Sequence, residues 1–238
     1  MHLFLYVGEK NNADMVCSGQ YKITEEGKIL NTIRFKIADD GKCYERRLNI
    51  SGKLYKNEYI ERWKIRFPEG KLYEDNSFNL QALFLSDKIE FLEYEGYYQV
   101  VHEGSITSKP IDADKLPFDE WDRVAGDVKL RHPAGVDEEM FDLTTLSFFT
   151  YFLMIRNRKR EYLNNDAGDN NSSDIEKITN RLQEITNKHF YDMRKNRYLS
   201  FFSYPQIPIK QKLGVRLFCS FCRKNRLFGL VKLVYKVM

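Results

Sequence analysis

The first 110 residues carry the alternation of apolar and polar side chains that is typical of half-buried β-strands. The clearest alternation spans residues 59–67. Its two faces hold three apolar and three cationic side chains: Trp63, Ile65 and Phe67 on one, Arg62, Lys64 and Arg66 on the other. This pattern predicts a strand whose basic face is exposed to solvent.

Turn-forming dipeptides divide the same part of the chain into short segments. Asp40-Gly41 is a strong signal for a two-residue hairpin, and Ser51-Gly52 marks a second turn. About eight strands are expected, over residues 3–7, 18–24, 33–37, 44–50, 59–67, 78–85, 89–94 and 97–102. No helical pattern separates them. The sequence therefore predicts an antiparallel β module over residues 1–110, built as a meander, a sandwich or a small barrel.

Residues 111–136 interrupt this rhythm with Pro117 and Pro133 and with many acidic side chains. The acidic residues are Asp112, Asp114, Asp119, Glu120, Asp122 and Asp127. We interpret the stretch as an acidic connector with a short helix around residues 118–124.

From Asp137 onward the apolar positions follow the period of an α-helix. Residues 140–155 are apolar nearly all round and predict a largely buried helix. A second helix is expected over residues 173–189 and should pack back on the first as a hairpin. Its apolar stripe consists of Ile175, Ile178, Leu182, Ile185 and His189.

Residues 213–238 predict a basic amphipathic helix with a break at Gly229, although residues 231–237 also suit a strand. Together these elements predict a helical module over residues 137–238. The expected fold class is α+β, with the antiparallel β module first and the helical module second.

Charge is distributed unevenly along the chain. Residues 193–238 hold eleven Lys and Arg and no Asp or Glu, whereas residues 1–192 hold 27 basic and 34 acidic side chains. The net charge of +4 conceals this asymmetry, which prompts a search for nucleic-acid or membrane contact. The hydrophobic share of 42% is enough to build a core, so a folded chain is expected.

The basic tail, residues 193–238, has three interpretations. It can be a packed helix whose cations pair with the acidic connector, a segment that lies on an anionic membrane, or a segment that binds nucleic acid. Its many Phe, Leu and Val residues favour lipid over phosphate among the last two. The candidate anion-binding residues are Arg216, Arg223, Lys224, Arg226, Lys232 and Lys236 of the tail, with Arg62, Lys64 and Arg66 of the predicted basic strand.

The four cysteines do not form a disulfide framework, and no secretory signal is visible in the sequence. A cytoplasmic location is therefore expected, with or without peripheral attachment to a membrane. The longest apolar run, residues 143–155, has thirteen residues, and a membrane-spanning helix needs about 20. No transmembrane segment is expected.

Catalytic motifs are weak throughout the sequence. Cys219 and Cys222 form one Cys-x-x-Cys pair, but a zinc site needs two more ligands and a redox site needs a βαβ setting. In the acidic connector, carboxylates and His132 form a metal or acid–base site only if the fold makes them converge. These carboxylates are Asp112, Asp114 and Asp127. We therefore predict no catalytic residue, no metal and no cofactor.

The sequence favours a non-catalytic binding or adaptor protein. Its β module would hold a ligand or a protein partner, and its basic end would dock on an anionic surface, a membrane in preference to nucleic acid. One alternative is a nucleic-acid-binding protein that uses the strand cations together with the tail. Another is a metal-dependent hydrolase or nuclease centred on the acidic connector. The oligomeric state stays open.

Overall fold

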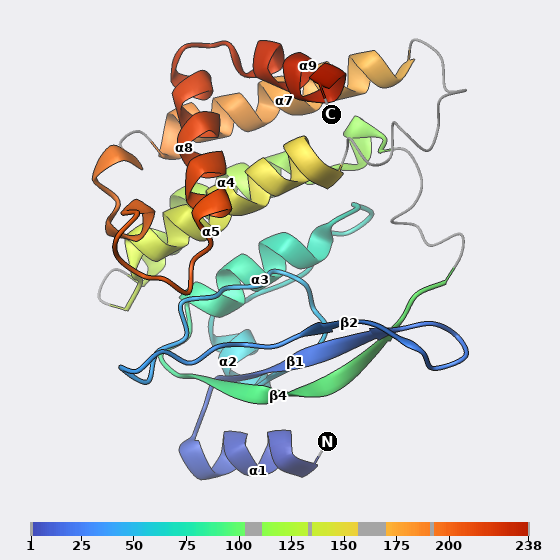
Figure 1. Cartoon of the computed structure of the whole chain (residues 1–238). Coiled ribbons are helices and arrows are strands. Elements are labelled where there is room, and N and C mark those ends of the chain that lie inside the picture. The colour runs from blue at the N-terminus through green and yellow to red at the C-terminus, as the bar shows by residue number, and fades with distance from the viewer. Residues whose placement is uncertain (1, 103–110, 133–134, 157–169, 191–192, 238) are drawn as a thin grey trace.

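A computed structural model describes residues 2–102, 111–132, 135–156, 170–190 and 193–237. The fold is α+β, as the sequence predicts, with a small sheet in the N-terminal part and helices after it (Figure 1). The helical half lies on one side of the sheet, and the N-terminal helix lies on the other. Within the described ranges, no helix combines the length and the apolarity needed to cross a membrane.

Strand β1 (Met15–Ile23) is the centre of the sheet. On one side it pairs antiparallel with β3 (Lys53–Tyr55) through its first half and with β2 (Ile29–Ile33) through its second half. On the other side β4 (Ile89–Val100) pairs with it in parallel along its full length. A parallel neighbour needs a crossover, and helices α2 and α3 supply it between β3 and β4. The sheet is thus antiparallel in two of its pairings and parallel in the third.

Three of the expected strands are wrong, because those residues form helices. They are α1 (His2–Asn11), α2 (Asn57–Arg62) and α3 (Glu74–Phe84). Every residue from 76 to 85 is buried, so both strand and helix fit the apolar pattern there. The strand expected at residues 44–50 is absent, and the two expected at residues 89–94 and 97–102 are one strand over residues 89–100. Around the Asp40-Gly41 turn, Ile37 makes only an isolated bridge to Cys43.

The predicted basic strand face at residues 59–67 is also wrong. Tyr59, in the first part of the segment, is buried in α2 and donates a hydrogen bond to the carbonyl oxygen of Ala82, at 2.8 Å. The chain then leaves the helix through Lys64, which has a φ of 50°. This change of direction separates Arg62 from Arg66, so the alternation in sequence does not become one face of a strand.

The acidic connector contains more structure than predicted. A 3-10 turn, η2 (Ala113–Lys115), precedes α4 (Phe118–Arg131), which extends the expected short helix to 14 residues. Helix α5 (Glu138–Tyr151) confirms the buried helix and continues as a π turn, η3 (Phe152–Arg156). Its N-terminus is capped by Asp137, whose carboxylate accepts a hydrogen bond from the backbone N–H of Met140.

The remaining helices differ from prediction in their packing and their breaks. Helix α7 (Asn170–His189) packs chiefly against α4, α8 (Ile209–Arg223) and α9 (Leu227–Val237), instead of forming a hairpin with α5. Two 3-10 turns, η4 (Met193–Lys195) and η5 (Arg197–Leu199), precede α8. The tail breaks at Asn225, with a φ of 51°, and Gly229 lies inside α9. Residues 231–237, for which a strand was the alternative, are helical.

Buried side chains from the sheet and from the helices after it form a large continuous cluster, and Phe4, Ala13 and Val16 form a second, smaller one with α1. Trp121 of α4 is near the centre of the large cluster, and its ring contacts those of Phe148, Phe149 and Phe152. The boundaries at 1–110, 111–136 and 137–238 stay a prediction, because a shared core does not mark where one unit ends.

Two glycine substitutions are expected to change stability in opposite directions. In β1, a Cβ at Gly19 would stand 2.3 Å from the carbonyl oxygen of Ile33, so Gly19→Ala should lower the free energy of unfolding by about 1–3 kcal/mol. In α9, a Cβ at Gly229 meets nothing within 4 Å, so Gly229→Ala should raise it by about 0.5–1 kcal/mol. Urea unfolding measures both. A Gly19→Ala variant as stable as the parent chain would contradict the close approach of β1 to Ile33.

Candidate functional site

Two cations of the basic tail are used inside the fold. The Lys212 side chain is only 1% exposed, and its ammonium group donates to the carbonyl oxygens of Ser200, Ser203 and Tyr204, at 2.7, 2.6 and 3.2 Å. Burial lowers the pKa of Lys212. One helical turn further, Arg216 donates to the carbonyl oxygen of Leu199 at 3.0 Å, and its guanidinium lies over the Phe201 ring. These bonds hold the segment 199–204 against the surface of α8.

Four other tail cations are exposed, namely Arg223, Lys224, Arg226 and Lys232. Arg223, Lys224 and Arg226 lie around the turn between α8 and α9, and none has a carboxylate partner within the described residues. Lys232 lies over the Phe228 ring at 4.3 Å, and Lys236 belongs to α9. Phe221 and Phe228 are half-buried.

The three cations of the predicted basic strand lie in the N-terminal part, away from the tail. Arg62 is within 3.7 Å of Asp14 and 3.3 Å of Asp87. Arg66 pairs with Glu61 at 2.5 Å, and Lys64 is exposed. They do not join the tail in one surface. Anion binding by these nine cations stays a prediction.

The carboxylates of the acidic connector face α7 and their own helix. Asp114 pairs with Lys177, Asp119 with Arg181 at 2.8 Å, and Asp122 with Lys188 at 2.8 Å. The expected pairing of the connector with the tail is absent among the described residues. His189 is a helix–helix contact, as expected: its Nε2 lies 2.6 Å from the carboxylate of Asp122.

The candidate chemical groups do not come together. Asp112 caps η2, Asp127 faces Arg123 and Arg131, and His132 lies 2.9 Å from Asp87. Where residues are described, no three His, Cys, Asp or Glu side chains cluster as a metal site would require. Cys219 and Cys222 are buried, and burial raises the pKa of the Cys219 thiol to about 12 and that of Cys222 further. Both thiols are therefore held protonated, which makes them weak nucleophiles and poor ligands.

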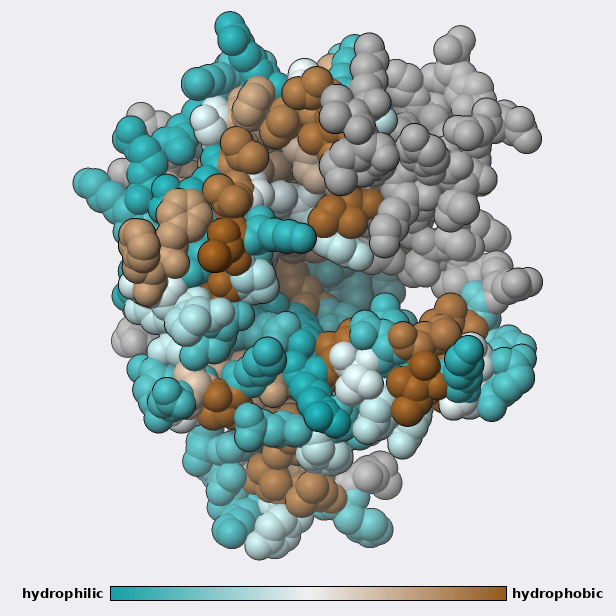
Figure 2. Space-filling model, in the orientation of Figure 1, coloured by the Kyte–Doolittle hydropathy of each residue, from teal (hydrophilic) through white to brown (hydrophobic). Residues whose placement is uncertain are grey.

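An apolar strip runs along the outer side of α8. Ile209, Leu213 and Leu217 are 58%, 44% and 52% exposed, and they recur every four residues. Phe202 precedes this strip in the chain, in the segment that Lys212 fixes, and its side chain is fully exposed. Figure 2 shows apolar side chains gathered over α8 and α9, beside a hollow between the helical half and the sheet.

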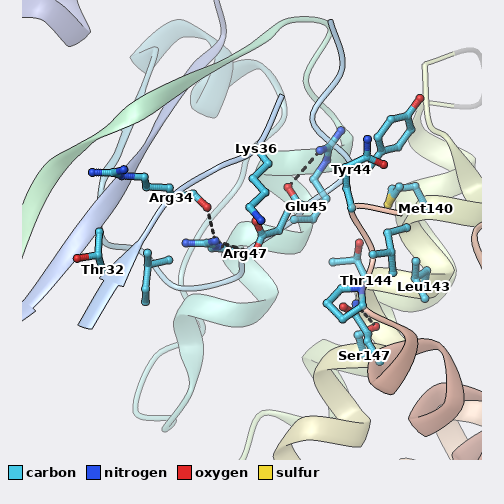
Figure 3. A pocket seen from close by; sticks show the side chains of 16 residues that line it. Thr32, Arg34, Lys36, Tyr44, Glu45, Arg47, Met140, Leu143, Thr144 and Ser147 are labelled. Carbon is cyan, nitrogen blue, oxygen red and sulfur yellow. Dashed lines mark hydrogen bonds and ion pairs between the residues drawn. The ribbon is translucent and has the colours of Figure 1, made fainter. Parts of the chain in front are cut away.

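This hollow is a cleft formed by two adjoining cavities of about 700 and 900 Å³. Both cavities contact the segment 45–47 on the sheet side and Thr144, Ser147 and Gln211 on the helical side. Figure 3 shows Lys36, Glu45 and Arg47 facing Met140, Leu143, Thr144 and Ser147 of α5 across the smaller cavity. The larger cavity extends between α5, η3, α8 and α9.

Positive charge dominates the smaller cavity. Its lining includes Arg34, Lys36, Arg46 and Arg47, and Glu45 is its one carboxylate among the described residues. Glu45 is already paired, because the Nε and Nη2 atoms of Arg47 both donate to it, at 2.9 and 2.7 Å. The cleft thus combines an electropositive end with an apolar end.

Sequence reasoning missed this cleft because its two walls come from distant segments. The cations of the cleft, Arg34, Lys36, Arg46 and Arg47, fall within the strands that the alternation predicts at residues 33–37 and 44–50, and nothing in sequence connects them with α5. The four-residue spacing of Ile209, Leu213 and Leu217 is a signal for the strip, but the predicted amphipathic helix begins only at residue 213, and its apolar side is the one expected to be buried.

Replacement of Lys212 is expected to free the segment 200–204. Lys212→Met leaves three carbonyl oxygens without their donor, which should lower the free energy of unfolding by about 1–3 kcal/mol. Chemical denaturation measures the change. Lys210→Met is the matched control, because Lys210 is exposed on the same helix and its replacement should change stability by less than about 0.5 kcal/mol. Equal effects of both substitutions would rule out a structural role for the buried ammonium.

Comparison with known proteins assigns no family to this arrangement. No protein-family model matches the chain, and no curated protein matches it at a significant level. The function is therefore argued from three features of the molecule: the cations at the α8–α9 turn, the apolar strip and the cleft.

Proposed function

We propose that the protein is a non-catalytic binding protein that docks on an anionic membrane surface through α8 and holds a ligand in the cleft. The supporting observation is an exposed apolar row on α8 together with unpaired basic side chains at the α8–α9 turn, of which Lys224, the C-cap residue, continues the side of the row. At about 100° per residue, Ile209, Leu213, Leu217 and Lys224 fall within about 80° of one another around the helix axis.

The composition of this side suits lipid. Each Lys or Arg near an anionic surface contributes about 1 kcal/mol, and Arg223, Lys224 and Arg226 have no carboxylate to compete with lipid head groups among the described residues. Burial of an exposed Leu or Ile side chain contributes up to about 1.5–3 kcal/mol. A helix with both properties binds in the plane of the membrane interface. The fully exposed Phe202 adds an aromatic ring to the same part of the molecule.

The nucleic-acid alternative has less support. It requires the strand cations and the tail to act together, and Arg62 and Arg66 are paired with carboxylates in a different part of the chain. Phosphate neutralisation also gives no reason for an exposed row of Ile and Leu. The hydrolase alternative requires Asp112, Asp114, Asp127 and His132 to converge, and each has another partner.

We place the protein in the cytoplasm, peripheral to a membrane. Its four cysteines are buried free thiols, which suits a reducing compartment. A protein partner that covers the apolar strip is the alternative occupant, and lipid is favoured because the cations beside the strip are uncompensated.

Vesicle co-sedimentation tests the docking. The full chain should bind vesicles of equimolar phosphatidylserine and phosphatidylcholine and should bind pure phosphatidylcholine much more weakly. The triple variant Arg223→Gln/Lys224→Gln/Arg226→Gln should lower the partition coefficient on the order of 100-fold, since three cations contribute about 1 kcal/mol each. Leu213→Ser/Leu217→Ser should weaken binding to both kinds of vesicle.

A second triple variant is the matched control. Arg62→Gln/Lys64→Gln/Arg66→Gln removes the same charge from the N-terminal part and should leave vesicle binding unchanged. Equal losses from the two triple variants would indicate a general charge effect and would overturn docking through α8. Absence of any preference for the anionic vesicles would do the same. Salt-dependent binding of single-stranded DNA that both triple variants weaken would favour the nucleic-acid alternative.

A further inference from the structure

The cleft contains more positive charge than its carboxylates neutralise. Among the four cations that line the smaller cavity, Arg34 pairs with Glu95, and Arg47 pairs with Glu45. Lys36 and Arg46 make no ion pair within the described residues, although Arg46 also feels the more distant charge of Asp137. Arg46 lines both cavities where they meet, and it also lines a neighbouring cavity of about 580 Å³ that contains Phe91 and Asp137.

Arg46 is the cation least able to reach solvent. Its Nη1 donates to the carbonyl oxygens of Cys43 and Glu45, and its guanidinium lies 4.9 Å from the centre of the Phe91 ring. Burial lowers its pKa. A guanidinium has five N–H donors in a planar fork that matches a carboxylate or a phosphate. Only Nη1 of Arg46 has an acceptor in the part of the chain that is described, so donors are left for an anion.

The other end of the cleft is apolar. The larger cavity is bounded mostly by side chains of α5, η3, α8 and α9, and its other wall is polar, with the segment 45–49 and with Asp75 and Asn76 of α3. The apolar side chains include Phe148, Phe152, Met154, Val215, Leu230 and Val234. Its volume of about 900 Å³ lies within the range of about 300–1,000 Å³ that is usual for small-molecule sites. A ligand that fills both cavities must therefore be anionic at one end and apolar over most of its length.

We infer that the cleft binds a single-chain anionic amphiphile, with its carboxylate or phosphate head against Arg46 and Lys36 and its alkyl chain along the apolar cavity. This inference rests on the proposed function only in that it names the ligand of the cleft, and it does not require docking through α8. It also relates the proposed docking surface to the cleft. Leu217 belongs to the apolar strip and Lys210 follows its first residue, and both also line the larger cavity. An alkyl chain therefore has a short path from a bilayer into the cleft.

Equilibrium dialysis below the critical micelle concentration tests the ligand class with five probes. Palmitate and oleoyl lysophosphatidic acid present the two head groups on a long chain, and one or both should bind saturably with one molecule per chain. Hexadecanol, which has the chain without the charge, should bind at least tenfold more weakly. Acetate and inorganic phosphate, which have the charge without the chain, should show no saturable binding. Tight binding of phosphate alone would identify a free-phosphate site and overturn the inference.

Three variants locate the site. Arg46→Met should weaken the binding of palmitate or lysophosphatidic acid at least tenfold and leave the weak binding of hexadecanol unchanged. Ser147→Trp places a large ring where the two cavities meet and should weaken all long-chain probes. Lys28→Met is the control, because it removes an exposed cation outside the cleft, and it should change nothing. Thermal unfolding verifies that each variant is folded.

The outcomes separate this inference from the docking. Unchanged palmitate and lysophosphatidic acid affinities in folded Arg46→Met, or equal affinity of the parent chain for these acids and for hexadecanol, would overturn the anionic amphiphile. If vesicles bind but no long-chain probe does, the inference is wrong and the docking stands. If a long-chain acid binds with the expected dependence on Arg46 but vesicles do not bind, the docking is wrong and the inference stands.

Discussion

The packing of the C-terminal half depends on a basic helix, α8, whose own segment of the chain supplies no carboxylate to pair with its cations. The segment 193–238 contains no Asp or Glu, yet α8 contributes Val215, Phe218 and Cys222 to the core. Its cations therefore have to be satisfied by other means. Lys212 donates to three backbone carbonyl oxygens, and Arg216 donates from Nη2 to one carbonyl oxygen and lies over an aromatic face, although its buried Nε has no acceptor among the described residues. Both solutions fix the segment 199–204 beside the helix.

The acidic connector cannot relieve the remaining charge, because α7 already occupies it. Lys177, Arg181 and Lys188 of α7 pair with carboxylates at three points along the connector. Helix α7 is in this way held against α4 by ion pairs at its surface and by Ile178, Leu182 and Ile185 in the core. The positive charge of the tail is consequently left at the α8–α9 turn, where it faces solvent.

Helices after residue 136 were largely predictable, because the information is local. Asp137 caps α5, and the stripe at Ile178, Leu182 and Ile185 is buried as its spacing indicates. The N-terminal part was predicted less well. Its strands were placed by alternation, and the alternation of residues 59–67 is produced by a helix end followed by a backbone turn at Lys64. Parallel pairing of β4 with β1 depends on a crossover of two helices, which no local pattern announces.

The candidate site was the least predictable part, for the same physical reason. Arg46 and Ser147 are far apart in sequence, and neither has a neighbour pattern that marks a binding residue. What the sequence did contain was the tail, and its interpretation changes with the packing. Helix α8 has three sides: one in the core at Phe218, one against the cleft at Gly214 and one in solvent at Leu213. Because a helix turns by about 100° per residue, the cleft side and the solvent side meet at Leu217. The cleft and the apolar strip therefore share one edge of one helix, which is why we propose them as two parts of a single binding site.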